Sequence, residues 1–428
     1  MGKLLLSLCS ASSILISFYA FILSFLRSTG LIHPIPSSAL ILPPASPGSL
    51  GDEAMVVGLG NYLQQKGITN VSLVAFNINE KYPIETYEYL DMRDFFIYQK
   101  WYSFLGKFIK FGYWVSRYER FYCLGADLMD GYYSDYATFK RVKMVEMAAK
   151  LNLTSAILGF SYNRQPTQVS IKVLKDLPSK VKLYARDILS YQRLKMEIPS
   201  GSVNLVTDLA FLLSPVEKSE KVDKSLQWIE KQKIQGRNIL GININNLLIS
   251  KLPDQSADTL IQAFVDGIIQ ISAKDNFLSF IFLPHDFRNI QGNLSDDKLA
   301  DKIIEKLPHH IQSICFKIPF PCEAAEVKAT VKHIDYALSS RMHLAIACLG
   351  QSTPVACISY QDKFAGLYQH FDLEPLIISP PELFTENTTK LVDLVFNLIE
   401  KQHQYKEQII NKLPEIKEKS SIQIETTS

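Results

Sequence analysis

Short apolar runs alternate with helical patterns along this chain, and they do so in two successive series. The runs are rich in Val, Ile, Leu and Phe and are bounded by Gly, Pro, Asn or Asp, which is typical of buried strands. The first series runs from a strand at residues 38–42 to one at 203–206, and the second runs from 238–243 to 355–359. Strands that alternate with helices form parallel sheets covered by helices on both faces. The sequence therefore predicts an α/β fold of two doubly wound domains facing a cleft.

The length of 428 residues also fits two domains. Apolar residues make up 47% of the chain and charged residues 21%, which is the composition of a globular protein. A candidate hinge lies at Gln235-Gly236-Arg237. We expect an N-terminal apolar segment and linker at 1–36, a first domain at 37–235, a second domain with a closing helix at 236–413, and a polar tail at 414–428.

The charge of the chain argues against nucleic-acid binding, and its cysteine spacing argues against a disulfide framework or a zinc site. The net charge of +2 provides no general attraction to nucleic acid. None of the six cysteines forms a CxxC pair, so we expect reduced thiols and a catalytic part that faces the cytoplasm. His, Asp and Glu residues show no metal-ligand spacing, and we expect neither a metal nor a cofactor.

The N-terminal residues 4–26 are uncharged and mostly apolar, and they lie between Lys3 and Arg27. This length is sufficient to span a bilayer, which predicts a single-span membrane anchor. A signal peptide, a misassigned start and a loosely membrane-bound helix are the alternatives. The balanced flanking charges do not determine an orientation. We expect residues 37–413 to fold without this segment.

The most informative stretch for function is Ser339–Val355, in which Arg341 and His343 lie where an apolar strand turns into a helix of small residues. The planar guanidinium suits phosphate or carboxylate, and the imidazole can exchange a proton near neutral pH. Backbone N–H groups at a helix start also favour an anion. The alternative is a core helix that starts with a capped histidine and a surface arginine.

Six further segments accompany this stretch in a fixed order. The segments are the glycine loops 48–54 and 125–131, the Arg-Asp-x-x-Ser run at 185–190, the Asp-x-Ala-Phe run at 208–211, and the segments 283–286 and 360–367. Together with Ser339–Val355 they resemble the polysaccharide pyruvyl transferase family. There are two departures: Ser49 stands where the family often has Asn, and the second glycine loop is poorer in glycine.

The resemblance implies a GT-B-like fold of two Rossmann-like domains and the transfer of pyruvate from phosphoenolpyruvate to a sugar, forming a ketal. It implies Arg186, Arg341 and His343 as catalytic residues. Phosphoenolpyruvate carries a phosphate and a carboxylate, so the two arginines, one from each half, could clamp it, and His343 could act as general acid or base. The expected substrate-binding residues are Gly51, Asp52, His285, Asn243, Lys363 and Met342. The expected partners are phosphoenolpyruvate and a glycan or lipid-linked sugar acceptor.

Several assignments have alternatives. His285 could bind the acceptor or hold a loop, Asp52 could bind acceptor hydroxyls or cap its helix, and Lys363 could be a solvated surface lysine. We expect Asp187 to cap its helix. A nucleotide-sugar-dependent glycosyltransferase of the same fold remains the main alternative function. A non-catalytic membrane-anchored protein is disfavoured by the Arg186, Arg341 and His343 set.

Overall fold

The computed structural model describes residues 2–97, 101–199, 201–252, 254–288, 294–359, 363–384 and 388–425. The chain divides into two compact units. Unit 1 comprises Met1–Pro47, Met55–Leu212 and Lys417–Ser428, and unit 2 comprises Gly48–Ala54 and Leu213–Ile416. This division differs from the expected boundary at 235/236, because the helix that precedes residue 235 belongs to unit 2.

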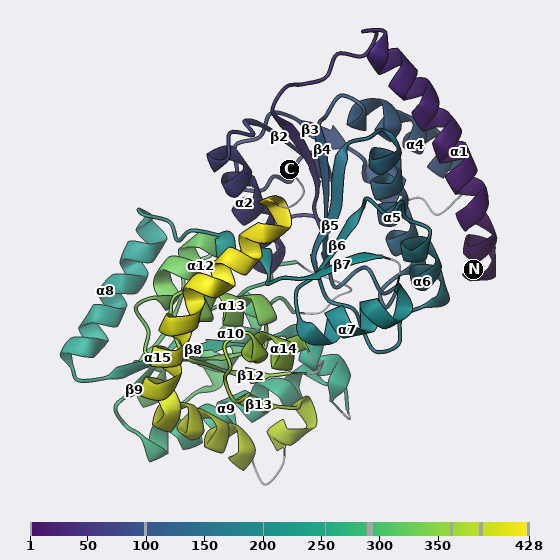
Figure 1. Ribbon diagram of the computed structural model, residues 1–428. Coiled ribbons are helices and arrows are strands. Elements are labelled where there is room, and N and C mark those ends of the chain that lie inside the picture. Colours follow the sequence, from purple (N-terminus) through teal and green to yellow (C-terminus); the bar gives the residue numbers. More distant parts are fainter. Residues whose placement is uncertain are drawn as a thin grey trace. The chain divides into compact units, whose positions relative to one another are not determined.

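The core of unit 1 is a seven-stranded parallel sheet in the order β3-β2-β1-β4-β5-β6-β7 (Figure 1). Every residue of the apolar run Ser38–Leu42 is buried, as expected for a strand covered on both faces. The order reverses between β1 and β4, which is the arrangement of a Rossmann fold. The strands are β1 Ser38–Leu42, β2 Asn70–Ala75, β3 Tyr89–Asp91, β4 Arg120–Ala126, β5 Thr154–Phe160, β6 Lys182–Ala185 and β7 Ser202–Leu205.

Helices connect these strands, and local capping determines where several of them begin. The side chains of Ser134, Thr167 and Asp187 each accept a hydrogen bond from a backbone N–H in the first turn of their helix. The capping role predicted for Asp187 is therefore confirmed. The helices of unit 1 are α1 Gly2–Ser28, α3 Arg93–Ile97, α4 Trp101–Val115, α5 Asp135–Lys150, α6 Gln168–Lys175, α7 Ile188–Glu197 and the 3-10 helix η1 Leu209–Leu212, and α2 Leu50–Gln65 begins in unit 2 and continues in unit 1.

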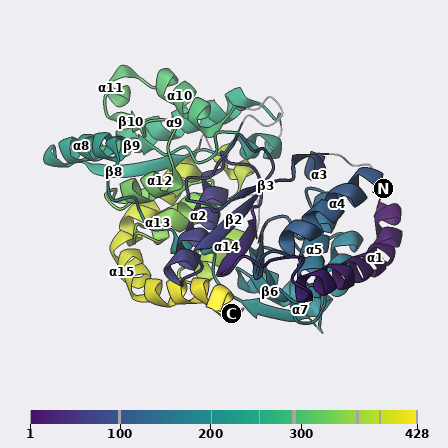
Figure 2. The ribbon, with the colours of Figure 1, turned by 90° about the horizontal axis from the view of Figure 1, so that it is seen from above.

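The N-terminal helix α1 is long and apolar enough to cross a membrane by length and composition. It also lies against α4, α5 and α6, and Figures 1 and 2 both show it along the outer side of these helices. Leu5, Cys9, Ile16, Ala20 and Leu23 are at most 3% exposed and belong to the hydrophobic core cluster of unit 1. The helix is therefore a packed element of unit 1, which the sequence analysis did not anticipate.

Unit 2 contains a six-stranded parallel sheet in the order β10-β9-β8-β11-β12-β13. This is again the Rossmann order, so both predicted Rossmann-like domains are confirmed. The strands are β8 Asn238–Asn243, β9 Leu278–Phe282, β10 Cys315–Lys317, β11 Tyr336–Ser339, β12 Val355–Ile358 and β13 Ile377–Ile378. The helices are α8 Glu220–Ile234, η2 Asn246–Lys251, α9 Ala257–Lys274, α10 Asp296–Lys306, α11 His309–Gln312, α12 Ala324–Val331, α13 Met342–Leu349, α14 Lys363–Gln369 and η3 Pro380–Phe384.

The closing helix α15 spans Thr389–Glu425 and contains Pro414. The prediction of a loose polar tail from residue 414 onward is wrong, because the helix continues for more than two further turns. Ile416 and Ile424 are buried, Ser420 Oγ donates to the carbonyl of Asp208 at 2.8 Å, and Gln423 Nε2 donates to that of Thr207 at 3.1 Å. The end of α15 is thus held to unit 1 by side chains that donate hydrogen bonds to buried carbonyls, although residues 414–425 contain few apolar side chains.

Candidate active site

Polar residues of unit 2 gather where the strand order reverses, between β8 and β11. Loops that follow the carboxyl ends of parallel strands meet at such a point, and ligands bind there in open α/β sheets. Ser340 Oγ donates to the carbonyl of Asn243 at 3.1 Å, and Asn245 Nδ2 donates to the carbonyl of Ser340 at 3.3 Å. These bonds hold together the loops that follow β8 and β11, immediately before Arg341 in the sequence.

Arg341 is held by two carboxylates. Its Nε and Nη2 atoms donate to Asp296 at 3.1 and 2.7 Å, and its Nη1 lies 3.2 Å from Asp286 Oδ2. The Arg341 side chain is 15% exposed, whereas those of Asp296 and Asp286 are 0% and 6% exposed. All three nitrogens of the guanidinium are therefore engaged by carboxylates of unit 2.

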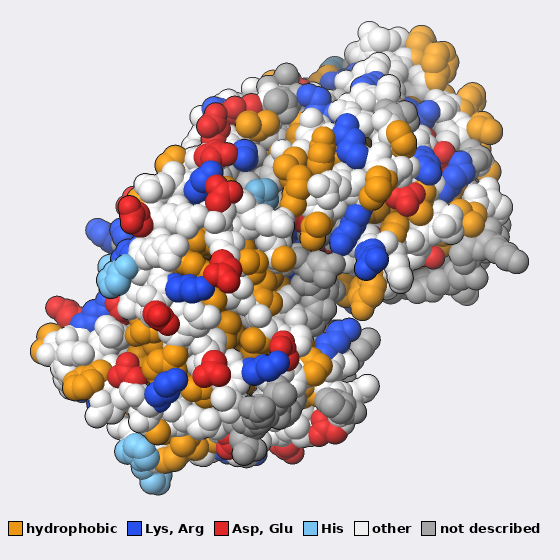
Figure 3. Space-filling model, turned by 60° about the horizontal axis from the view of Figure 1, so that its bottom comes forward, with side chains coloured by type: hydrophobic (Ala, Val, Ile, Leu, Met, Phe, Trp, Pro, Cys, Tyr) orange, Lys and Arg blue, Asp and Glu red, His pale blue; other side chains and the backbone are white. Residues whose placement is uncertain are grey.

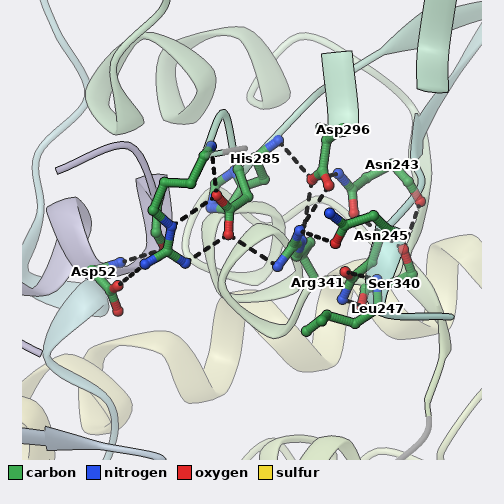
Figure 4. Close-up of polar contacts among 12 residues, drawn as sticks. Asp52, Asn243, Asn245, Leu247, His285, Asp296, Ser340 and Arg341 are labelled. Atoms are coloured by element: carbon green, nitrogen blue, oxygen red, sulfur yellow. Dashed lines mark hydrogen bonds and ion pairs between the residues drawn. The ribbon is translucent and has the colours of Figure 1, made fainter. Parts of the chain in front are cut away.

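Asp286 also binds Arg288, which extends the network to the first glycine loop. Arg288 Nε and Nη2 donate to Asp286 at 3.0 and 2.7 Å, and Arg288 Nη1 lies 3.5 Å from Asp52 Oδ2. Figure 4 shows the continuous series of polar contacts from Asp52 past His285 to Arg341, Asp296 and Asn243. Asp52 lies in the first turn of α2, where its carboxylate interacts favourably with the helix dipole. The same carboxylate also pairs with Arg288.

His285 is the buried histidine of the network, with 3% of its surface exposed. Its backbone N–H donates to Asp296 at 3.1 Å and its carbonyl accepts from the Leu50 N–H at 3.0 Å. Within the described residues, neither ring nitrogen has a hydrogen-bond partner. Burial, together with the positive charges of His343 and Arg341, lowers the pKa of His285 well below its usual value. The ring is therefore neutral at pH 7 and can accept a hydrogen bond.

His343 lies in the first turn of α13, beside the start of α2. A Cβ built on Gly51 would lie 2.3 Å from His343 Nδ1 and 2.8 Å from His343 Cβ. Only a glycine at this position leaves room for the imidazole. Met342 is 7% exposed and packs in the core at the first position of the helix. Gly51, His285, Arg341 and His343 therefore lie in neighbouring segments of unit 2, and their roles in binding and catalysis stay predictions.

Glu53 links the same glycine loop to helix α12. Its Oε1 accepts from the Ala324 N–H at 2.6 Å, and its side chain is buried. Burial is the main cause that raises the pKa of Glu53 to about 7, and the neighbouring Glu323 and Glu326 add to it. No motif or spacing in the sequence singles out Glu53.

Arg186 occupies a separate network in unit 1. Its Nε donates to Ser161 Oγ at 2.9 Å, its Nη1 donates to Asp208 at 2.8 Å, and its Nη2 pairs with Asp127 of the second glycine loop. Burial opposes the charge of Arg186, but the three carboxylates Asp127, Asp208 and Asp187 outweigh it and raise the pKa of Arg186. Because Arg186 and Arg341 belong to different units, their joint use by one donor stays a prediction.

Two residues of the network were missed. Arg288 follows the Leu-Pro-His-Asp segment with no motif of its own, and Asp296 resembles an ordinary acidic residue of a helix first turn. Only the fold brings Asp296 next to Arg341. Lys363 is the first residue of α14 and is half-buried, so its role as a further cation stays a prediction. Tyr360–Asp362 of the last predicted segment lie outside the described residues.

Within the part of the chain that the structure describes, no group of three His, Cys, Asp or Glu side chains could hold a metal ion. All six cysteines are free thiols, and five of them are buried. On the face drawn in Figure 3, basic and acidic side chains are interspersed rather than gathered into a basic stripe.

Comparison with known proteins adds two findings. The family model described as polysaccharide pyruvyl transferase matches residues 50–362. No curated protein matches the chain by sequence.

Solved structures with the same fold are distant in sequence. A UDP-GlcNAc 2-epimerase from Neisseria meningitidis bound to UDP-GlcNAc has a TM-score of 0.53 at 13% identity, covering 91% of this chain and 99% of its own. An UDP-forming trehalose-phosphate synthase from Burkholderia xenovorans has a TM-score of 0.53 at 9% identity, with 92% and 99% covered. A ugt transferase from Siraitia grosvenorii in complex with UDP has a TM-score of 0.52 at 10% identity, with 89% and 95% covered. These similarities show a GT-B-like fold.

Proposed function

The chain belongs to the polysaccharide pyruvyl transferase family, and from this premise we propose that it transfers pyruvate from phosphoenolpyruvate to two hydroxyls of one sugar. The acceptor is a cell-surface glycan or its lipid-linked precursor, and the products are a pyruvyl ketal and inorganic phosphate. The free thiols support a catalytic part that faces the cytoplasm. The observation that carries the proposal is the placement of Arg341 and His343 at the start of α13, beside the buried neutral ring of His285.

The start of α13 suits the anionic donor. Arg341 precedes the first helical residue, and the first N–H groups of an α-helix have no acceptor within the helix. Asp296 and Asp286 fix the orientation of the Arg341 guanidinium, and the donor would take N–H groups on the Nη1 side. Three carboxylates and two guanidiniums give this network a net charge of −1 without the donor. Binding of the anion would therefore rely on the N–H groups at the start of α13 and on a further cation such as Lys363.

The two histidines suit the two proton movements that the reaction requires. One sugar hydroxyl attacks the central carbon of phosphoenolpyruvate while its methylene carbon gains a proton and becomes a methyl group. The second hydroxyl then attacks the central carbon as phosphate leaves with the remaining proton. We assign the protonation of the methylene carbon to His343 and the hydrogen bond from an acceptor hydroxyl to the neutral ring of His285, with Asp52 and Asn243 nearby to orient the sugar. In total, the acceptor gains one pyruvic acid and loses one water.

Arg186 is proposed to bind the other anionic group of the donor. Its guanidinium is anchored by Asp127 and Asp208, so it is ordered before the donor arrives. Lys363 and Met342 are proposed to complete the donor site.

The direct test is to incubate the purified chain with phosphoenolpyruvate and an extract of lipid-linked and free glycans, and to measure phosphate and product mass. We expect release of phosphate that depends on the acceptor, and a product heavier than the acceptor by the mass of pyruvic acid less that of water. Arg341→Lys and His343→Asn serve as matched inactive variants. The alternative, transfer from a nucleotide sugar, is tested in parallel with a panel of UDP-, GDP- and ADP-sugars. Acceptor-dependent release of nucleotide without any turnover of phosphoenolpyruvate would contradict the proposal.

A further inference from the structure

Helix α1 has two apolar faces, and only one of them is covered by the protein. The covered face carries Leu5, Cys9, Ile16, Ala20 and Leu23. The opposite face carries large apolar side chains that are 57–72% exposed, namely Ile14, Leu15, Phe18, Phe21 and Phe25. An apolar face of this size in contact with water is costly, which marks it as an interaction surface.

The covered face is tied to unit 1 by buried polar contacts as well as by packing. Lys143 Nζ donates to the Cys9 carbonyl at 3.1 Å, to Ser13 Oγ at 2.8 Å and to Glu146 at 2.8 Å, and Ser13 Oγ donates to Glu146 at 3.1 Å. The Lys143 and Glu146 side chains are 0% and 2% exposed. If α1 left unit 1 to span a bilayer, this buried ion pair would lose two partners and the core cluster would lose its cover. Detachment is therefore unfavourable.

The charges around the exposed face indicate its partner. Helices α1, α4 and α6 contain no Asp or Glu, and their basic residues include Arg27, Lys110 and Lys175. Lys107 of α4 and Lys172 of α6 instead pair with Asp94 and Asp176, both at 2.7 Å. On α4, Ile109 and Tyr113 are also about half exposed, and Tyr19 of α1 donates to the Ile109 carbonyl at 3.0 Å. Exposed aromatic and aliphatic side chains between basic residues suit an anionic lipid surface. A second copy would instead bring like charges together.

We propose that α1, held against α4 and α5, lies in the plane of an anionic membrane surface and inserts Phe18, Phe21 and Phe25 between the lipids. The helix thus binds the membrane without crossing it. This proposal replaces the single-span anchor that the sequence predicts, and it does not depend on the proposed reaction.

The first test measures binding of the full-length chain to sonicated vesicles by co-sedimentation. Vesicles of phosphatidylcholine with about one third phosphatidylglycerol are expected to bind the protein at least 10-fold more strongly than phosphatidylcholine alone. The triple variant Phe18→Ser, Phe21→Ser, Phe25→Ser should reduce this binding at least 30-fold. A matched variant with three exposed apolar residues of unit 2 replaced, Ile234→Ser, Phe277→Ser and Phe320→Ser, should bind like the wild type. Equal binding by both triple variants would overturn the proposal.

The second test separates lying on the membrane from crossing it. Ser7→Cys and Ser28→Cys, near the two ends of α1, are introduced separately into a Cys315→Ser background in which the other native cysteines are buried. After binding to preformed vesicles, both positions should react with a membrane-impermeant maleimide added outside. Protection of one end only would show a spanning helix. A dimer in light scattering that the Phe triple variant abolishes would show that a second copy covers the face, and would also overturn the proposal.

Discussion

Replacing Gly51 by alanine tests whether the placement of His343 controls catalysis. A Cβ at this position would lie 2.3 Å from Nδ1 and 2.8 Å from Cβ of His343, whereas ordinary van der Waals contacts begin near 3.4 Å. The imidazole must therefore move by about 1 Å, and because its own Cβ is also too close, rotation of the ring does not relieve the overlap. A displacement of about 1 Å in a catalytic group costs on the order of 100-fold in rate. We expect kcat for phosphoenolpyruvate turnover to fall about 100-fold, with a smaller change in KM.

The control is Gly106→Ala, because a Cβ at Gly106 in α4 meets no atom within 4 Å. This variant should keep the wild-type kcat. Gly51→Ala should also lose about 1–3 kcal/mol of stability from overpacking, so activity is measured well below the Tm of each variant. A folded Gly51→Ala enzyme with a kcat within 3-fold of the wild type would refute the assignment of His343 to the chemical step.

Three further predictions follow from the contacts described above. Arg341→Lys should lower kcat/KM for phosphoenolpyruvate, with a loss of about 2–5 kcal/mol of transition-state stabilisation, because an ammonium cannot hold Asp296 and the donor together. Asp296→Asn should instead change mainly KM, and steady-state kinetics measures both effects. The pKa of Glu53 rises from 4.5 to about 7 on folding, so the folded state binds more protons, and the stabilisation is complete below pH 4.5 and is lost as the pH rises through 7. In denaturation experiments, the free energy of unfolding of Glu53→Gln should therefore rise by about 3 kcal/mol relative to that of the wild type between pH 4.5 and 8. Parallel stability curves for the two proteins would contradict this. Removal of residues 1–36 should lower the Tm by at least about 5 °C in calorimetry, because it uncovers the core cluster and the Lys143–Glu146 pair, and an unchanged Tm would show that α1 is not part of unit 1.

The sequence predicted those parts of the fold that depend on local patterns. Buried strands such as β1 and β8 have continuous apolar runs, and the cap at Asp187 follows from its own side chain and the next three residues. The Arg341 and His343 pair could be found because both lie in one short stretch. In contrast, the partners of Arg341 come from the loop after β9 and the start of α10, and neither spacing nor composition relates Asp296 to Arg341 before the chain has folded.

The packing of the N-terminal and C-terminal helices could not be predicted from the sequence, for the same physical reason in both. The burial of α1 and of the end of α15 depends on surfaces far away in the sequence. Residues 4–26 resemble a membrane span because their mean hydropathy is high, although one face packs on α5. Residues 414–425 resemble a tail because they are polar, although Ser420 and Gln423 satisfy buried carbonyls. Hydropathy alone does not distinguish lipid from protein as the apolar environment, and polarity alone does not distinguish water from a buried hydrogen bond.

The division of the chain has a consequence for how the protein is synthesised. Unit 2 requires Gly48–Ala54, which leave the ribosome well before Leu213–Ile416, and unit 1 requires Lys417–Ser428, which leave it only after the whole of unit 2. The carbonyls of Thr207 and Asp208 therefore lack their side-chain partners from α15 until the second unit has been translated. The nascent chain must keep a nearly finished first unit soluble while the whole second unit is being made, so this protein should depend on chaperones during translation more than a protein of equal size with contiguous domains.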